Sequence, residues 1–249
     1  MGQRAFTLIE LIVVMTVVLI LASLLVGAMR NAQAGANQIS CMSRLRQLQF
    51  AWTMYVNDHN DQLPLNQTVQ NQPGRNAPGS WVTGNPKEDK TEDPIKAGSL
   101  FQYVGTAAIY RCPADYSFVT GTKLLRNRSY SISRYMNGDG ADPRIKKTFP
   151  AIVSPPPSSI FVFIEEHEDS LWVGSFDVAP KSGFSLSAST GWTSTPSSRH
   201  GQRSNLTFAD GHSENRRWQE PKTSGLQSVS TLSKELKNDL SRLQSSIPD

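Results

Sequence analysis

The first thirty residues restrict the fold of this chain most, because they contain an almost unbroken apolar run from Phe6 to Ala28. A helix of this length is enough to cross the hydrocarbon core of a bilayer, which is roughly 30 Å thick. Glu10 is the only charged residue in the run. A carboxylate at mid-bilayer costs on the order of 2.5–3.5 kcal/mol, so an acid at such a place indicates a function. No small-residue cleavage site follows the run, and we therefore expect a helix that is retained in the mature protein.

The string Ala5-Phe6-Thr7-Leu8-Ile9-Glu10 resembles the start of the type IV prepilin and type II secretion pseudopilin superfamily. There, a short basic leader ends in a small residue and Phe-Thr-Leu-Ile-Glu opens a hydrophobic helix. The resemblance implies a leader at 1–5, cleavage between Ala5 and Phe6 by a prepilin peptidase, and N-methylation of Phe6. Glu10 then takes the position of the superfamily's signature acid. The residue before the cut is usually Gly in the superfamily and is Ala5 here. The alternative is a plain signal anchor in which Glu10 is incidental.

Glu10 also has a physical use in assembly. The free α-amino group of a processed Phe6 would be cationic, and each of the two charges is costly in a dry bundle unless it is paired. A pair between Glu10 of one subunit and Phe6 of its neighbour would set the axial register of packed helices. The expected partners are therefore a prepilin peptidase and methylase, other pilin-like subunits and the inner-membrane assembly machinery.

The resemblance also implies a single-pass protein of the bacterial inner membrane, with a cytoplasmic amino terminus and an extracytoplasmic head. The flanking charges do not support this orientation, since Arg4 precedes the run but Arg30, Arg44 and Arg46 follow it. The orientation therefore depends on the resemblance alone.

Beyond the run, apolar residues at spacings of three and four predict that the helix continues with one face on the head. They are Cys41, Leu45, Leu48, Trp52 and Tyr55. Polar turn formers at 57–61 and Pro64 predict its end. We therefore expect a transmembrane half at 6–28 and an extracytoplasmic half at 29–60.

The remaining patterns predict an α+β fold, in which the long helix packs on an antiparallel sheet within a pilin-like head at 61–225. Strands are expected at 129–133 and 160–164, with 171–176 as the hairpin partner of the second. Asp210-Gly211 predicts a further hairpin with a type I′ turn. Apolar residues every three or four positions predict an amphipathic helix at 226–249 that packs on the head, with docking to a neighbouring subunit as the alternative.

Cys41 and Cys112 are the two cysteines of the chain. In an oxidising compartment they would form a bridge that staples the helix to the head and stabilises it by roughly 4 kcal/mol. Two buried free thiols are an equally good interpretation, because sequence does not establish the geometry.

Three motifs in the head resemble the "H-x9-DG" group of prepilin-type proteins. They are Cys41 to Leu48, Tyr110 to Asp115, and His200 followed by Asp210-Gly211. The resemblance implies a pilin-like scaffold and does not name a ligand. Similarity to the major pseudopilin of type II secretion, whose head binds calcium, adds Ca²⁺ as a candidate cofactor.

Five residues offer oxygen and nitrogen ligands for such an ion, namely Glu165, Glu166, His200, Asp210 and His212. The alternative is a structural role in which Asp210 caps its turn and His200 satisfies a strand end. No Gly-x-Ser-x-Gly elbow or His-Glu-x-x-His motif is present, so we expect no enzyme.

The resemblance therefore implies a cleaved and N-methylated subunit that assembles through its N-terminal helix into a type II secretion or type IV pilus-like filament. Two other functions remain as alternatives. One is an anchored binding module for a metal or a glycan, with Trp81, Trp172 and Trp192 as a sugar platform. The other is a metal-dependent hydrolase centred on His200 and Asp210. Nucleic-acid binding is not expected, because the net charge is only +4 and no basic stripe with interleaved aromatic residues appears.

Overall fold

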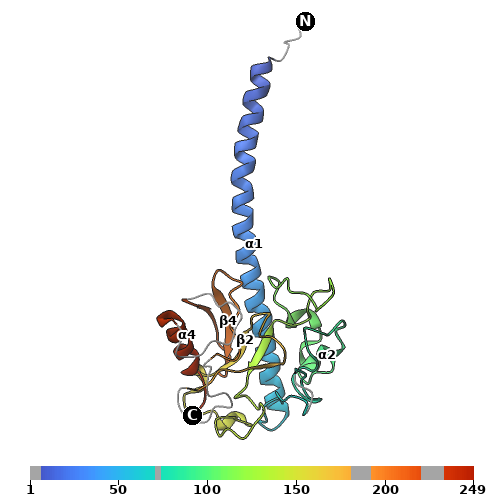
Figure 1. Cartoon of the computed structure of the whole chain (residues 1–249), viewed down its shortest axis with the longest axis vertical. Coiled ribbons are helices and arrows are strands. Elements are labelled where there is room, and N and C mark those ends of the chain that lie inside the picture. Colours follow the sequence, from blue (N-terminus) through green and yellow to red (C-terminus); the bar gives the residue numbers. More distant parts are fainter. Residues whose placement is uncertain (1–6, 71–73, 181–191, 220–232) are drawn as a thin grey trace.

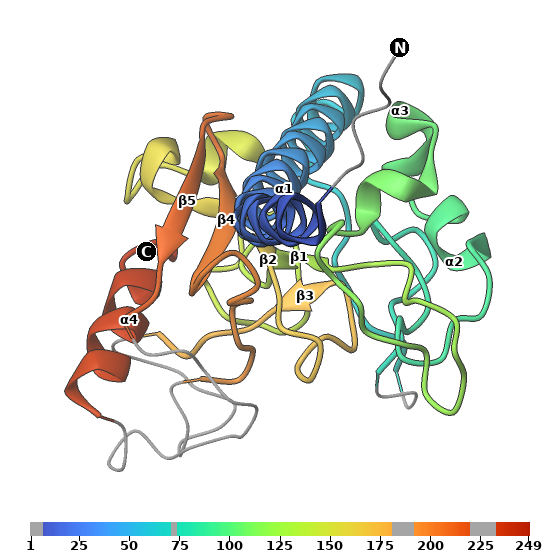
Figure 2. The same ribbon diagram turned by 90° about the horizontal axis from the view of Figure 1, so that it is seen from above.

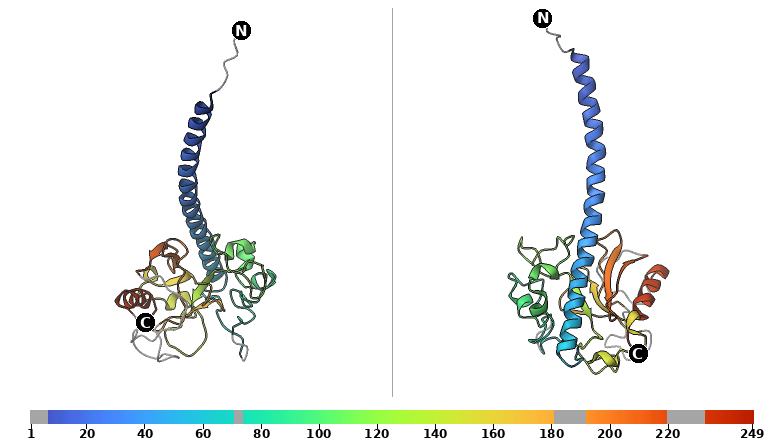
Figure 3. Two further views of the ribbon diagram at one scale, coloured as in Figure 1. Left: turned by 45° about the horizontal axis from the view of Figure 1, so that its top comes forward. Right: turned by 180° about the vertical axis from the view of Figure 1, so that it is seen from behind.

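The computed structural model describes residues 7–70, 74–180, 192–219 and 233–249. A single long helix, α1 (Leu8–Asp58, 51 residues), rises from an α+β head, and only its second half packs on that head (Figure 1). Two further views show that the helix bends gently along its length (Figure 3). The predicted α+β fold with one long helix against a sheet is confirmed.

Both ends of α1 have local causes. Thr7 caps the start: its hydroxyl accepts from the backbone N–H of Glu10 at 3.3 Å, and the Glu10 carboxylate accepts from the Thr7 N–H at 2.9 Å. At the other end Asn60 and Asp61 take positive φ angles of 51° and 61°, which stops the helix. The N–H of Asp61 donates to the carbonyl of Val56 at 3.0 Å and satisfies one of the terminal acceptors.

The two halves of α1 differ completely in burial. None of the window Leu8–Leu25 is buried, and this helix alone in the described part of the chain is long and apolar enough to cross a membrane. In the second half the predicted stripe faces the core, with Cys41, Leu45, Leu48 and Trp52 at most 1% exposed and Tyr55 partly buried. The stripe therefore has the predicted orientation.

The described part of the head contains a five-stranded sheet in the order β3-β1-β2-β4-β5. The strands are β1 (Tyr130–Ser133), β2 (Phe161–Glu165), β3 (Ser175–Phe176), β4 (Arg203–Phe208) and β5 (Ser213–Arg217). All neighbours pair antiparallel except β1 and β3, which are parallel. Viewed from above, α1 crosses the sheet and contacts β2, β4 and β5, with α3 on the side away from β5 (Figure 2).

Short helices complete the head. They are α2 (Asp93–Lys96), α3 (Phe101–Val104), the 3₁₀ turns η1 (Ala107–Tyr110), η2 (Phe149–Ala151) and η3 (Pro157–Ser159), and α4 (Lys234–Gln244). The last is amphipathic: Leu236, Leu240 and Leu243 are buried in the core of the same chain, and the hydroxyl of Ser233 caps the helix by accepting from Leu236 N at 3.1 Å. Of the range predicted to hold this helix, 226–232 lies outside the described residues.

The hairpin expected between 160–164 and 171–176 is wrong. β2 has β1 and β4 as its two neighbours, and β3 instead lies at the sheet edge beside β1. Ile132 N donates to the carbonyl of Gly174 at 2.8 Å, ahead of the parallel pairing. Gly174 also lies against Trp81, and an added Cβ would come within 2.4 Å of Trp81 Nε1. This long-range contact places the segment beside β1, and the alternation of polar and apolar residues along the sequence does not reveal it.

The hairpin at Asp210-Gly211 is present, but its turn is not type I′. Thr207 pairs with Ser213, and of Asp210 and Gly211 only Gly211 has a positive φ, of 95°. Gly211 N donates to the carbonyl of Phe208 at 2.9 Å. This is the pattern of a type I turn followed by a left-handed glycine, which the longer loop between β4 and β5 allows.

Candidate functional site

Four buried side chains converge where α1 meets the sheet: Cys41, Cys112, Glu165 and His200. Each offers one ligand atom, and all four atoms lie within 4.8 Å of one another. They come from four separate segments, namely α1, the loop after η1, the last residue of β2 and the turn before β4. Both cysteines are free thiols. We call these four residues the Cys-Glu-His cluster.

Local contacts hold the two cysteines in place. Cys41 occupies the buried stripe of α1, where its Sγ lies 3.2 Å from the hydroxyl of Tyr130 on β1. The backbone N–H of Cys112 donates to Ser129 Oγ at 3.0 Å. One turn along α1 from Cys41, the guanidinium of Arg44 donates to the carbonyl of Arg111 at 2.6 Å, which fixes the loop directly before Cys112.

His200 lies between a sulfur and a carboxylate. Its Nε2 is 3.4 Å from Cys112 Sγ and 3.3 Å from Glu165 Oε1. The other carboxylate oxygen, Glu165 Oε2, accepts from the backbone N–H and the side-chain amide of Asn205, both at 3.4 Å. Glu165 is fully buried. One of its carboxylate oxygens is therefore held by Asn205, and the other faces His200 inside the cluster.

The protonation states of the cluster depend on one another. Burial opposes charge on His200, but its contacts with Cys112 and Glu165 outweigh that and raise its pKa to about 10. Burial likewise opposes the charge on Glu165, yet His200 and Arg199 bring its pKa below the ordinary value. A hydrogen bond from the Cys41 thiol lowers the pKa of Cys112, whereas burial raises that of Cys41 well above its usual range. The four groups thus shift one another's pKa values.

Arg199 supplies the positive charge next to the cluster. Its guanidinium lies 3.2 Å from the carboxylate of Asp115, 2.7 Å from that of Glu168 and 3.7 Å from Glu165 Oε1. Asp115 in turn accepts from the hydroxyl of Ser129, the residue that holds Cys112 N. The Cys112-Pro113-Ala114-Asp115 motif therefore connects its cysteine to Arg199 through one buried network.

The five residues proposed from sequence as ion ligands fall into separate places. Glu165 and His200 belong to the cluster. Glu166, the next residue after β2, is buried beside Ser131, whose hydroxyl donates to its carboxylate, and burial raises the pKa of Glu166 to about 7. Asp210 and His212 form an exposed pair at the β4–β5 turn, with Oδ1 and Nδ1 2.6 Å apart. His200 and Asp210 therefore do not form the centre that a hydrolase would need.

Cys41 and Cys112 complete the cluster, whereas the sequence predicts only that they form a bridge or remain free thiols. The sequence does contain a signal that groups them with His200. Cys41 on the helix stripe and Cys112 in the Cys-Pro-x-Asp turn belong to the same set of three motifs as His200. The three tryptophans do not form a sugar platform: Trp81 and Trp192 are buried, and only Trp172 is exposed, with Lys87 Nζ 4.7 Å from its ring centre.

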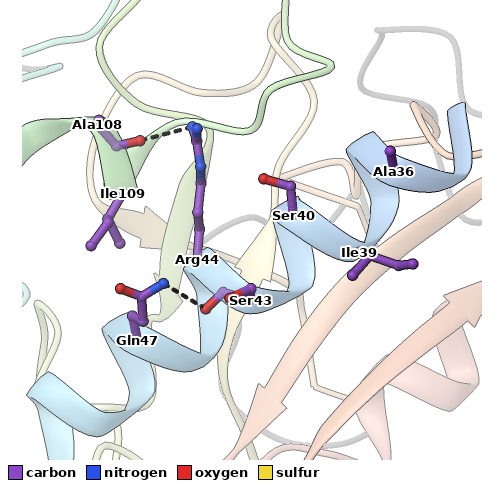
Figure 4. Close-up of a pocket in the computed structure, with 8 residues that line it drawn as sticks. All are labelled: Ala36, Ile39, Ser40, Ser43, Arg44, Gln47, Ala108 and Ile109. Atoms are coloured by element: carbon purple, nitrogen blue, oxygen red, sulfur yellow. Dashed lines mark hydrogen bonds between the residues drawn. The ribbon is translucent and has the colours of Figure 1, made fainter. Parts of the chain in front are cut away.

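A groove of about 510 Å³ lies on the outer side of α1, next to η1 (Figure 4). Arg44 crosses it to the carbonyl of Ala108 at 2.9 Å, and Ile39 stands 74% exposed at its edge. None of its lining residues belongs to the Cys-Glu-His cluster, so the groove does not open on the cluster.

The processing site Ala5-Phe6 lies outside the described residues. Glu10 is described, and besides its backbone contacts its carboxylate accepts from the hydroxyl of Thr7 at 2.7 Å. In the single chain the acid is therefore held by the cap at the start of the helix.

Comparison with protein families finds one match: residues 1–26 match the prokaryotic N-terminal methylation motif. Comparisons with curated proteins and with solved structures find no match. The chain is thus prepilin-like at its amino-terminal end, where the motif implies processing by a prepilin peptidase and the apolar helix indicates anchoring in a membrane.

Proposed function

We propose that this chain is a prepilin- or pseudopilin-like subunit that is cleaved before Phe6, N-methylated, and assembled through α1 into a type II secretion or type IV pilus-like filament. The head is extracytoplasmic and serves as a structural unit, without catalysis. The proposal joins the matched motif at residues 1–26 to the burial pattern of α1.

The observation that carries it is the exposed apolar half of α1. The window Leu8–Leu25 makes no burying contact with the head, yet continues without a break into the half that packs on it. Eighteen helical residues span about 27 Å, close to the hydrocarbon thickness. Such a surface suits lipid before assembly and neighbouring helices after it.

The position of Glu10 suits both the single subunit in lipid and the assembled bundle of helices. In the single subunit its carboxylate accepts from the backbone and hydroxyl of Thr7, which offsets part of the cost of placing it in lipid. In a bundle, the methylated amine of a neighbour's Phe6 would replace Thr7 as its partner. The exchange turns a local cap into a contact between subunits that fixes their stagger.

Crosslinking in membranes tests the proposal. A photoreactive residue at Val14 of the full chain should yield a ladder of crosslinked multimers, and Glu10→Val should reduce it about tenfold, which corresponds to about 1.4 kcal/mol. The matched control is Glu92→Val, because Glu92 is an exposed acid of the head whose partner Lys96 is also exposed. Both variants should be processed and inserted normally. Monomers alone in the wild-type chain would contradict assembly, and equal ladders for Glu10→Val and wild type would contradict the role of Glu10.

A further inference from the structure

We propose that Cys41, Cys112, Glu165 and His200 bind one Zn²⁺ ion that fastens the long helix to the head. The assignment depends only on the Cys-Glu-His cluster and does not require filament assembly.

The donor set matches zinc better than calcium. Two sulfurs, one imidazole nitrogen and one carboxylate oxygen are ligands that zinc takes in tetrahedral sites, whereas Ca²⁺ takes six to eight oxygens. With Zn–S about 2.3 Å and Zn–N about 2.0 Å, neighbouring ligand atoms of a tetrahedron lie about 3.3–3.8 Å apart. The distances of 3.4 Å from Cys112 Sγ to His200 Nε2 and 3.3 Å from there to Glu165 Oε1 agree with this. The longest separation in the cluster is at most 4.8 Å, so a small contraction closes it around an ion.

The orientation of Glu165 also suits a metal ligand. Its Oε2 accepts twice from Asn205, which fixes the carboxylate, while its buried Oε1 faces His200 Nε2 at 3.3 Å inside the cluster. A buried carboxylate needs a positive charge beside it, and a metal ion bound between Glu165 and His200 would supply one.

The neighbouring groups suit such a centre. Two thiolates and one carboxylate would bring three negative charges to a dication, and the guanidinium of Arg199, 3.7 Å from Glu165 Oε1, lies beside this negative charge. The hydroxyl of Tyr130, 3.2 Å from Cys41 Sγ, donates to that thiolate once the metal has displaced its proton. These are the outer contacts that orient metal ligands in known sites.

The site is closed, which assigns it a structural role. All four ligands are buried and fill the tetrahedron, so no position remains for a substrate or a reactive water. The ion would join α1 to the loop after η1, to β2 and to the turn before β4. The junction between the long helix and the head would then be fixed by metal bonds.

The test uses the full chain purified in detergent without reducing agent or chelator. We expect one zinc per chain by mass spectrometry of the metal, and two titratable thiols after denaturation with chelator. Removing zinc and adding Co²⁺ should give the visible bands of tetrahedral cobalt together with thiolate-to-cobalt charge transfer. Absence of bound metal, loss of both thiols to a disulfide, or a cobalt spectrum without the sulfur transition would each overturn the proposal.

Variants locate the site. Cys112→Ser and Glu165→Gln should each weaken Co²⁺ binding about tenfold or more, and the Gln variant keeps the oxygen that accepts from Asn205. The matched control is His212→Asn, which removes the exposed imidazole paired with Asp210 and should leave affinity unchanged. A variant that fails to fold leaves the wild-type spectrum as the deciding measurement. Binding lost in His212→Asn but kept in Glu165→Gln would place the ion at the hairpin and overturn the assignment.

Discussion

Trp52 shows how much a single residue contributes to holding the long helix on the head. Its side chain is 1% exposed and its ring meets that of Phe149 edge-on at 6.1 Å. Trp52→Ala should therefore lower the free energy of unfolding by about 3–5 kcal/mol. Phe50, two residues earlier and 66% exposed, is the matched control, and Phe50→Ala should change it by less than about 0.5 kcal/mol. Denaturant unfolding followed by tryptophan fluorescence and circular dichroism measures both. Equal small effects would mean that this face of α1 is not a core face.

Tyr130 gives a second prediction at the same scale. Its hydroxyl lies 3.2 Å from Cys41 Sγ, so Tyr130→Phe removes a contact to a metal ligand while keeping the ring in the core. Affinity for Co²⁺ should fall about tenfold, the lower end of what outer contacts contribute. Tyr135→Phe is the control, because the hydroxyl of Tyr135 donates to the carbonyl of Val178. Equal affinities for the two variants would remove Tyr130 from the metal site.

Residue types alone could predict part of the candidate site. Carboxylate and imidazole are ligand groups, so the sequence predicts Glu165 and His200 as ligands, and it indicates the two cysteines as a possible bridge. Their grouping was not predictable, since 124 positions separate Cys41 from Glu165 in the chain. The same reasoning added Asp210 and His212, which the hairpin holds at the surface.

Among the elements, α4 is the one whose partner was left open by its pattern. Leu243 is fully buried and, with Leu236 and Leu240, belongs to the core of its own head. Leu243→Ala should therefore lower the free energy of unfolding by about 2–5 kcal/mol. Lys237→Ala, on the exposed face of the same helix, should change it by less than about 0.5 kcal/mol. If stability stayed the same while crosslinking between subunits in membranes fell, α4 would be an assembly element instead.

Elements with local causes could be predicted, and elements placed by distant contacts could not. The length of α1 follows from its apolar run, its stripe and its polar end, and the β4–β5 hairpin follows from Asp210-Gly211. The placement of β3 follows from Gly174, whose carbonyl accepts from Ile132 N and from Trp81 Nε1 at 3.1 Å. Neither partner is near Gly174 in the chain. The sequence therefore predicts a hairpin between this segment and the preceding strand β2, and this prediction is wrong.

On the scale of the whole molecule, the structure divides into an exposed apolar rod and a head with its own core. The residues of the Cys-Glu-His cluster and of the hydrophobic core begin at Cys41, and the window Leu8–Leu25 contributes none of them. Stability of the head and membrane anchoring should therefore be separable.

A fragment from Gln33 onward tests this separation. It removes the exposed apolar rod and keeps the stripe from Cys41 to Tyr55, whose burial supplies most of the stability of that half of the helix. It should be soluble and monomeric in analytical ultracentrifugation, unfold cooperatively in urea, and bind Co²⁺ with the same thiolate transition as the full chain. The full chain in membranes should form multimers that the fragment does not. A fragment that aggregates or lacks a cooperative transition would mean that the head needs the rod to fold. A folded fragment that forms the same multimers would place the subunit contacts on the head, and α1 would then be an anchor alone.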